Sequence, residues 1–274
     1  MLIYIIYMLA IFLVFLFIFG TCLGSFLCCQ ARRLHFRATG HRIKNRRSIC
    51  LHCHHQLKWY DNLPIISWLI LKGKCRHCHK KIGIAELISE LAVGISFLLL
   101  GTTINVASAS VLEWYIFTAT IILVAVLAFL AIYDGLYGEL PTVFLYLALF
   151  LAIITAALKI VSAITTNTSI STIVINPLLS AIIFGGIYLF LYKVSKGKWV
   201  GDGDWLLCLP LGLVLAEPIL VFVALFVANL LACLVMLPIV QKTKNHQIYF
   251  GPFLVVAFVI TLSIAKYIHP LLHF

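Results

Sequence analysis

Gly201-Asp202-Gly203-Asp204 introduces a short apolar segment, residues 205–216, and this stretch decides how the chain folds. Twelve residues at about 1.5 Å each make a helix of roughly 18 Å, whereas the hydrocarbon core of a bilayer is roughly 30 Å thick. We therefore expect a half-helix packed inside a bundle, or a helix whose start lies below the membrane surface. Either arrangement brings Asp204 towards a protein-lined cavity. The alternative is an ordinary loop in which Asp204 caps a helix.

Asp134 occupies a similar position, because it directly follows the apolar run of residues 121–133. The whole chain has only nine acidic residues, and a carboxylate at the mouth of an apolar segment is costly unless it has a function. Two such aspartates predict a catalytic pair, Asp134 and Asp204. Gly201 and Gly203 are expected to let the backbone bend tightly and a substrate chain approach closely.

The composition predicts an all-α polytopic membrane protein. Hydrophobic residues make up 63% of the chain and charged residues only 11%, and several apolar runs approach the length that spans a bilayer. The net charge of +11 would indicate a nucleic-acid partner in a soluble protein. Here thirteen of the twenty Lys and Arg residues lie within residues 32–81, which is typical of a cytoplasmic loop beside a membrane. We therefore expect the lipid bilayer as a partner and no nucleic acid.

Eight apolar segments are expected to form membrane helices, at residues 2–27, 86–100, 112–133, 141–158, 173–192, 205–216, 218–240 and 249–268. The first segment has no basic start, so we expect it to remain as a membrane helix rather than to be cleaved as a signal peptide. The expected domains are a first transmembrane helix (1–29), a cytoplasmic zinc-binding loop (30–84) and a membrane core with the GxGD motif (85–274).

This trace also predicts which groups share a side of the membrane. Crossing the bilayer with each segment in turn leaves eighteen of the twenty basic residues in the cytoplasm. The same trace brings Asp134 and Asp204 out at the cytoplasmic face, although they lie seventy residues apart. A shared site is therefore geometrically possible.

Two CxxC pairs in the basic loop predict a zinc site. Cys50 and Cys53 form the first pair and Cys75 and Cys78 the second, with twenty-one residues between the inner cysteines. Each pair places two thiolates on one tight turn, and together they complete a tetrahedral four-sulfur shell. Because such a shell leaves no position open for water, the zinc is expected to be structural, and this small loop needs it to fold.

Two alternatives to this ligand set remain open. Disulfide bonds would also use the cysteines, although thiols in the cytosol stay reduced. Histidines of the same loop are candidates to replace a cysteine as ligand: His52, His54, His55, His77 and His79.

Six motifs follow one another along the chain: Gly24-Ser25-Phe26-Leu27 with Arg33, Trp59-Tyr60-Asp61-Asn62-Leu63-Pro64 between the CxxC pairs, Glu90-Leu91 with Gly94, Asp134 with Leu140-Pro141, Gly201 to Asp204, and Phe250-Gly251-Pro252-Phe253. Together they resemble the type IV prepilin leader peptidases, bifunctional membrane enzymes of pilus, type II secretion and competence systems. The resemblance runs nearly end to end.

The chain departs from the family pattern at three places. Cys28 stands where the family usually has Asn, and Thr142 stands where the first aspartate motif ends in Asp. Trp205-Leu206 replaces the x-Lys that commonly follows GxGD. The positions of the family's two catalytic aspartates are retained as Asp134 and Asp204, and Asp202 occupies the variable position of GxGD.

The resemblance implies a bifunctional enzyme of the bacterial cytoplasmic membrane, with residues 85–274 as its peptidase core. An aspartic endopeptidase would cut the basic leader of a prepilin or pseudopilin next to a Gly at the cytoplasmic face. S-adenosylmethionine would then methylate the new N-terminus. The zinc loop is the expected host of this second activity, although the sequence has no recognisable methyl-donor motif.

Two other classes of function fit part of the pattern. A presenilin-like intramembrane protease also uses GxGD, but it does not account for the double CxxC loop. A non-enzymatic transporter or assembly factor with a zinc-ribbon docking loop would use Asp134 and Asp204 as ion-coupling carboxylates. Substituting either aspartate in such a protein would leave leader cleavage unchanged.

Overall fold

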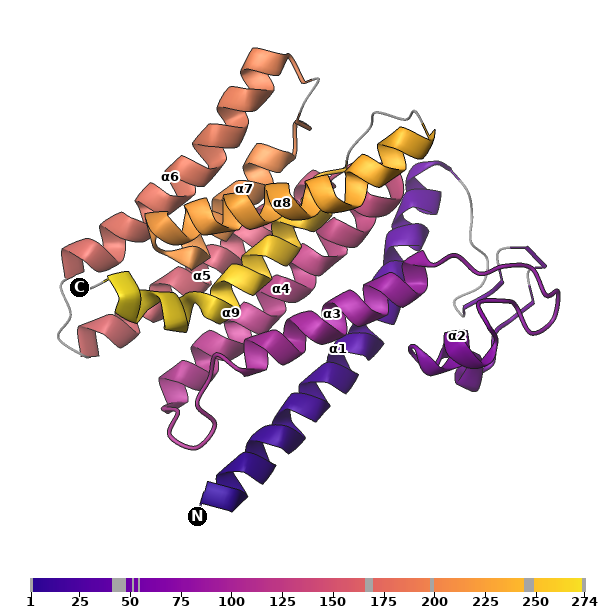
Figure 1. Cartoon of the computed structure of the whole chain (residues 1–274), viewed down its shortest axis with the longest axis horizontal. Helices are drawn as coiled ribbons and strands as arrows, with labels where there is room; N and C mark the ends of the chain where they lie inside the picture. Colours follow the sequence, from indigo (N-terminus) through magenta and orange to yellow (C-terminus); the bar gives the residue numbers. More distant parts are fainter. Residues whose placement is uncertain are drawn as a thin grey trace. The chain divides into compact units, whose positions relative to one another are not determined.

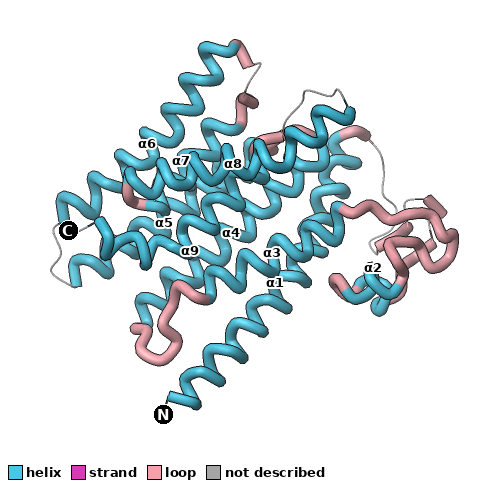
Figure 2. Tube along the Cα trace, viewed as in Figure 1, coloured by secondary structure: helices cyan, strands magenta, loops and turns pink. Residues whose placement is uncertain are grey.

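The computed structural model describes residues 2–40, 48–50, 52–53, 55–165, 170–197, 200–243 and 249–272. Within these residues the helices are joined by loops, and extended pairing is limited to two isolated β-bridges in the zinc loop (Figures 1 and 2). The chain divides into two compact units, Leu2–Leu98 and Leu99–Phe274, and each is described by itself.

All eight predicted apolar segments form helices, which confirms the all-α polytopic class. Six are long and apolar enough to cross a membrane: α1 (Leu2–Ala38), α4 (Val111–Tyr137), α5 (Thr142–Thr165), α6 (Ile170–Ser195), α8 (Pro218–Thr243) and α9 (Gly251–Leu272). The other two are shorter, α3 (Ala85–Gly101) with 17 residues and α7 (Asp204–Leu215) with 12.

Two helices run further than their apolar segments. α1 continues through the start of the basic block to Ala38, close to Gly40, whose φ of 81° ends it. α4 continues past Tyr133 to Tyr137 and ends at Gly138 with φ 70°. Hydropathy marks where a helix leaves the bilayer, whereas a left-handed glycine marks where the helix itself stops. Asp134 therefore lies inside the last turn of α4 rather than beyond its end.

The unit Leu2–Leu98 joins α1 and α3 through small residues. A Cβ atom on Gly20 would lie 2.8 Å from the carbonyl oxygen of Val93, and one on Gly24 would lie 2.6 Å from that of Ser89. The two backbones are therefore in contact, as small residues allow between membrane helices. Between these helices the zinc loop carries a 3₁₀ turn, η1 (Trp59–Asn62), and the short helix α2 (Ile66–Ile70).

In the unit Leu99–Phe274, α7 is the half-helix expected inside the bundle. It packs against α5, α6, α8 and α9, and most of its side chains are buried. Gly212 lies so close to α6 that a Cβ atom would be 2.6 Å from the carbonyl oxygen of Ser180. At the C-terminal end of α7, Nζ of the half-buried Lys159 donates to the carbonyl of Val214 over 2.8 Å. The last carbonyls of a helix have no partner within the helix, and this bond gives one of them, that of Val214, a donor.

Candidate functional site

Asp134 is a buried carboxylate near the C-terminal end of α4. Only 6% of this residue's surface is exposed. Oδ2 accepts a hydrogen bond from the backbone N–H of Gly251, the first residue of α9, over 3.0 Å. A residue 117 positions further along the chain thus fixes the carboxylate.

Asp204 is the first residue of α7 and is 5% exposed. Its Oδ2 accepts a hydrogen bond from the backbone N–H of Gly201 over 2.9 Å, so the carboxylate holds the loop that precedes α7. The N-terminus of α7 also favours negative charge there, because the unsatisfied N–H groups of a helix start are partly positive. The N-cap of α7 is Gly203, and the carboxylate of Asp204 binds a residue before the helix, so the alternative in which Asp204 caps a helix is not observed.

The two aspartates lie close enough for their carboxylates to interact electrostatically. The carboxylate of Asp204 acts electrostatically on that of Asp134 across the space between α7 and α4. The neighbouring acids are placed differently, because Asp202 and Glu139 are both exposed. Thr142, which replaces the family's usual Asp, is exposed as well. Asp134 and Asp204 are therefore both buried, whereas their neighbouring acids Asp202 and Glu139 are exposed.

Gly201 and Gly203 are required for space rather than for backbone freedom. Neither has a positive φ, which differs from the tight bend expected from the sequence. A Cβ atom on Gly203 would lie 2.8 Å from Cβ of Leu140, and one on Gly201 would lie 3.2 Å from Oδ2 of Asp204. Both glycines therefore let the loop approach its neighbours closely.

The candidate pair also depends on residues that were not assigned to it from the sequence. A Cβ atom on Gly251 would lie 2.7 Å from Oδ2 of Asp134, so a larger residue at this position would have to displace the carboxylate or the start of α9. Phe250 packs against Tyr188 of α6 with the two rings tilted and their centroids 5.7 Å apart, and Tyr188 interacts electrostatically with Asp204. The motif Phe250 to Phe253 could have pointed to Gly251 in the sequence, whereas no local sequence pattern distinguishes Tyr188.

The four predicted cysteines form a cluster in the unit Leu2–Leu98. The Sγ atoms of Cys50, Cys53, Cys75 and Cys78 all lie within 4.8 Å of one another, and those of Cys50 and Cys78 are 3.9 Å apart. Zn–S bonds of about 2.3 Å in a tetrahedron separate the sulfurs by about 3.8 Å. The donor set and its spacing therefore fit a metal ion.

Each CxxC pair lies on a short hairpin turn. The N–H of Cys50 donates to the carbonyl of His55, and that of Cys75 donates to the carbonyl of Lys80. An isolated β-bridge closes each turn, Ile49 with Gln56 and Lys74 with Lys81. The two knuckles thus present their thiols in the same way.

Hydrogen bonds within the cluster favour the thiolate of Cys50 and raise the pKa of Cys53 to about 11. Burial opposes ionisation, but hydrogen bonds from the backbone of Cys53 and His52 lower the pKa of Cys50 to about 7. Among the described residues the cluster holds cysteines alone, and His55 and His77 stack on each other at 4.5 Å instead. His54 lies outside the described residues.

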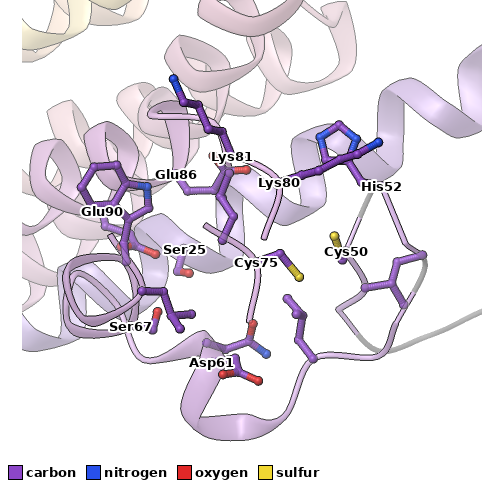
Figure 3. A pocket seen from close by; sticks show the side chains of 16 residues that line it. Ser25, Cys50, His52, Asp61, Ser67, Cys75, Lys80, Lys81, Glu86 and Glu90 are labelled. Carbon is purple, nitrogen blue, oxygen red and sulfur yellow. The ribbon is translucent and has the colours of Figure 1, made fainter. Parts of the chain in front are cut away.

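A pocket of about 180 Å³ adjoins the cysteine cluster within the same unit (Figure 3). Cys50 and Cys75 lie at one side of it, and Glu86 and Glu90 of α3 at the other. Among the described residues, Nε1 of Trp68 and Oε2 of Glu86 are buried without a hydrogen-bond partner. A buried donor and a buried acceptor that line one pocket can be satisfied by a bound molecule.

These features define a class of protein: a helical membrane protein with a buried aspartate pair and a separate four-thiol loop. Comparison with known proteins narrows the class. Residues 18–104 match the family model "Bacterial Peptidase A24 N-terminal domain". A prepilin leader peptidase/N-methyltransferase of Myxococcus xanthus is 40% identical over 87 residues, which cover 32% of this chain and 25% of that protein.

Two further relatives carry the same name. The Vibrio cholerae protein is 48% identical over 50 residues, which cover 18% of this chain and 20% of that protein. The Aeromonas hydrophila protein is 26% identical over 219 residues, which cover 77% of this chain and 69% of that protein. The matched part thus spans about a quarter or less of the first relatives. No solved structure matches the chain. Residues 18–104 of the chain are thus similar to the N-terminal domain of the bacterial A24 peptidases, and the relatives that match are prepilin leader peptidase/N-methyltransferases.

Proposed function

We propose that this protein is an aspartic endopeptidase of the bacterial cytoplasmic membrane that removes the leader of prepilins or pseudopilins, with Asp134 and Asp204 as its catalytic pair. The single observation that carries the proposal is the burial of these two carboxylates in one site of the membrane unit. The family relatives named above support the reaction class. The basic loop supports a site at the cytoplasmic face.

The chemistry follows from two carboxylates that share a poorly solvated site. Both cannot ionise easily, so the pair holds one proton. The ionised member removes a proton from water, and the water oxygen attacks the carbonyl carbon of the scissile peptide bond. The protonated member gives its proton to the amide nitrogen as the C–N bond breaks. The N–H groups of Gly251 and Gly201 hold the two carboxylates in place during these steps.

We assign zinc to the cysteine cluster as a structural ion held by Cys50, Cys53, Cys75 and Cys78. A closed four-sulfur shell leaves no position for water or substrate, so the ion takes no part in cleavage. It fixes the two knuckles relative to each other. The small loop between them has little apolar core of its own.

Removing one ligand is expected to release the metal. Purified protein should hold about one zinc per chain, and Cys53→Ser or Cys75→Ser should lose nearly all of it, because three thiolates no longer complete the shell. Elemental analysis of the purified variants measures the loss. The control is Cys22→Ser, an exposed cysteine of α1 that should leave the zinc content unchanged. Full zinc in both knuckle variants would overturn the assignment.

We place the second activity, N-methylation, at the pocket beside the cysteine cluster. S-adenosylmethionine, when bound, supplies an electrophilic methyl group to the new N-terminal amine. The unpartnered Nε1 of Trp68 and Oε2 of Glu86 fit a ligand that has both an acceptor and a donor. Arg32 holds the other oxygen of Glu86 over 2.6 Å, which orients the carboxylate.

Coexpression with a candidate prepilin tests both activities. Intact mass analysis of the pilin should show loss of the leader and a further gain of one methyl group. Absence of leader loss in every pilin and pseudopilin of the source genome would refute the peptidase. Leader loss without methylation would refute only the second activity.

A further inference from the structure

An exposed apolar face lies on the zinc loop. Ile66, Leu69 and Ile70 of α2 have the i, i+3, i+4 spacing that places side chains on one side of a helix, and all three are exposed. Trp59, which is 77% exposed, and Leu63 lie in or beside η1, which contacts α2. We call these five residues the apolar loop face. Exposed apolar groups gathered in this way mark a surface that binds a partner.

Exposed lysines flank the apolar loop face. Lys58 precedes η1, and Lys72 and Lys74 follow α2 directly. Residues 58–81 contain six basic residues against one acid, Asp61, and that acid is held by Arg76 over 2.8 Å. A partner that fits this surface therefore has an apolar part next to negative charge.

One hydrogen bond fixes the depth of this surface along the membrane helices. The backbone N–H of Ile65, just before α2, donates to Oε2 of Glu90 in the second turn of α3 over 2.7 Å. The φ of Ile65 is 61°, which a β-branched residue rarely adopts, so the carboxylate holds a strained turn in place. The start of α2 therefore lies beside the second turn of α3.

The same turn of α3 lies against the apolar part of α1. A Cβ atom on Gly24 would be 2.9 Å from Cα of Glu90, so these residues are level with each other. Gly24 precedes Arg32, the first basic residue, by eight positions, which is about 12 Å along a helix. Measured along α1, the start of α2 is therefore level with the apolar part of that helix, further into the bilayer than Arg32.

We propose that the apolar loop face inserts into the headgroup region of the bilayer that α1 crosses, with the flanking lysines on anionic lipid headgroups. The apolar side chains provide burial at the boundary with the acyl chains. The lysines add attraction to a negatively charged leaflet. Insertion holds the loop against the membrane surface independently of any substrate.

Photo-crosslinking of the full chain in nanodiscs tests this proposal. Leu69→p-benzoylphenylalanine places a probe on the apolar loop face, and Gln56→p-benzoylphenylalanine places a matched probe at an exposed position of the first knuckle. In nanodiscs with about one third phosphatidylglycerol, the Leu69 probe should give lipid adducts at least about fivefold above the Gln56 probe. Mass analysis of the crosslinked chain identifies a bound phospholipid. Zinc content shows that each variant retains its loop.

Charge reversal separates lipid binding from mere exposure. Lys72→Glu with Lys74→Glu should lower the lipid adducts of the Leu69 probe by about fivefold or more, and so should replacement of phosphatidylglycerol by phosphatidylcholine. Equal lipid adducts at the two probe positions would overturn insertion. Crosslinks from Leu69 to protein alone would also overturn it and would indicate that the face binds another segment or a pilin. If neither the lysine substitutions nor the change of lipid altered the adduct yield, the role of anionic lipid would be overturned.

Discussion

Asp134→Asn and Asp204→Asn are each expected to lower the rate of leader cleavage by about a thousandfold or more. Each substitution keeps the size of the side chain but removes the carboxylate, so the pair can no longer both activate water and donate a proton. The double variant should be no slower than either single variant, because groups that act as a unit give non-additive losses. Cleavage of a coexpressed prepilin, followed by mass, measures all three.

Exposed neighbours provide the matched controls. Asp202→Asn, Glu139→Gln and Thr142→Val alter residues that lie in solvent, and each variant should still cleave. Zinc content and membrane insertion of every variant show that folding is intact. Cleavage by Asp134→Asn together with loss of cleavage in Glu139→Gln would move the first catalytic carboxylate five residues along the chain. Unchanged cleavage in both aspartate variants would instead favour an ion-coupling role for the pair.

Gly251→Ala is expected to lower kcat about a hundredfold while the protein stays folded. The new methyl group would lie 2.7 Å from Oδ2 of Asp134, well inside an ordinary van der Waals contact. The carboxylate or the start of α9 must therefore move, and a displacement of about 1 Å at a catalytic group costs on the order of a hundredfold in rate. Single-turnover cleavage of a prepilin measures the effect.

Gly186→Ala is the matched control for this substitution. Gly186 lies in α6, and a Cβ atom there would meet no atom within 4 Å. This variant should cleave at the wild-type rate, and thermal unfolding should show both alanine variants to be folded. Wild-type kcat in Gly251→Ala would show that the position of Asp134 seen here is not needed for cleavage.

Local sequence patterns predicted most of the helices. Each apolar segment became a helix because a bilayer gives backbone groups no partner outside the helix. The short segment 205–216 was recognisable as a half-helix from its length alone, and α7 is one. The two CxxC pairs predicted which thiols would gather, and the cysteine cluster confirms that arrangement. The bound ion itself stays a prediction.

Contacts between distant segments could not be predicted in the same way. The N–H of Gly251 reaches Asp134 across 117 residues, and Leu140 fills the space that Gly203 leaves. Neither contact has a periodic signal, because each depends on how α4, α7 and α9 pack. The extension of α4 beyond Tyr133 was missed for a related reason, since hydropathy falls at Asp134 whereas the backbone hydrogen bonds continue to Gly138.

The bond from Lys159 to Val214 has a consequence for biogenesis. Lys159 lies in the last two turns of α5, where a charged side chain still costs free energy on insertion, although α5 as a whole is apolar enough to cross a membrane. The acceptor lies 55 residues later, on α7, and is synthesised after α6. α7 in turn is too short to remain across a bilayer alone. The lysine therefore gains its backbone acceptor, and the end of α7 its side-chain donor, only after α7 has been synthesised.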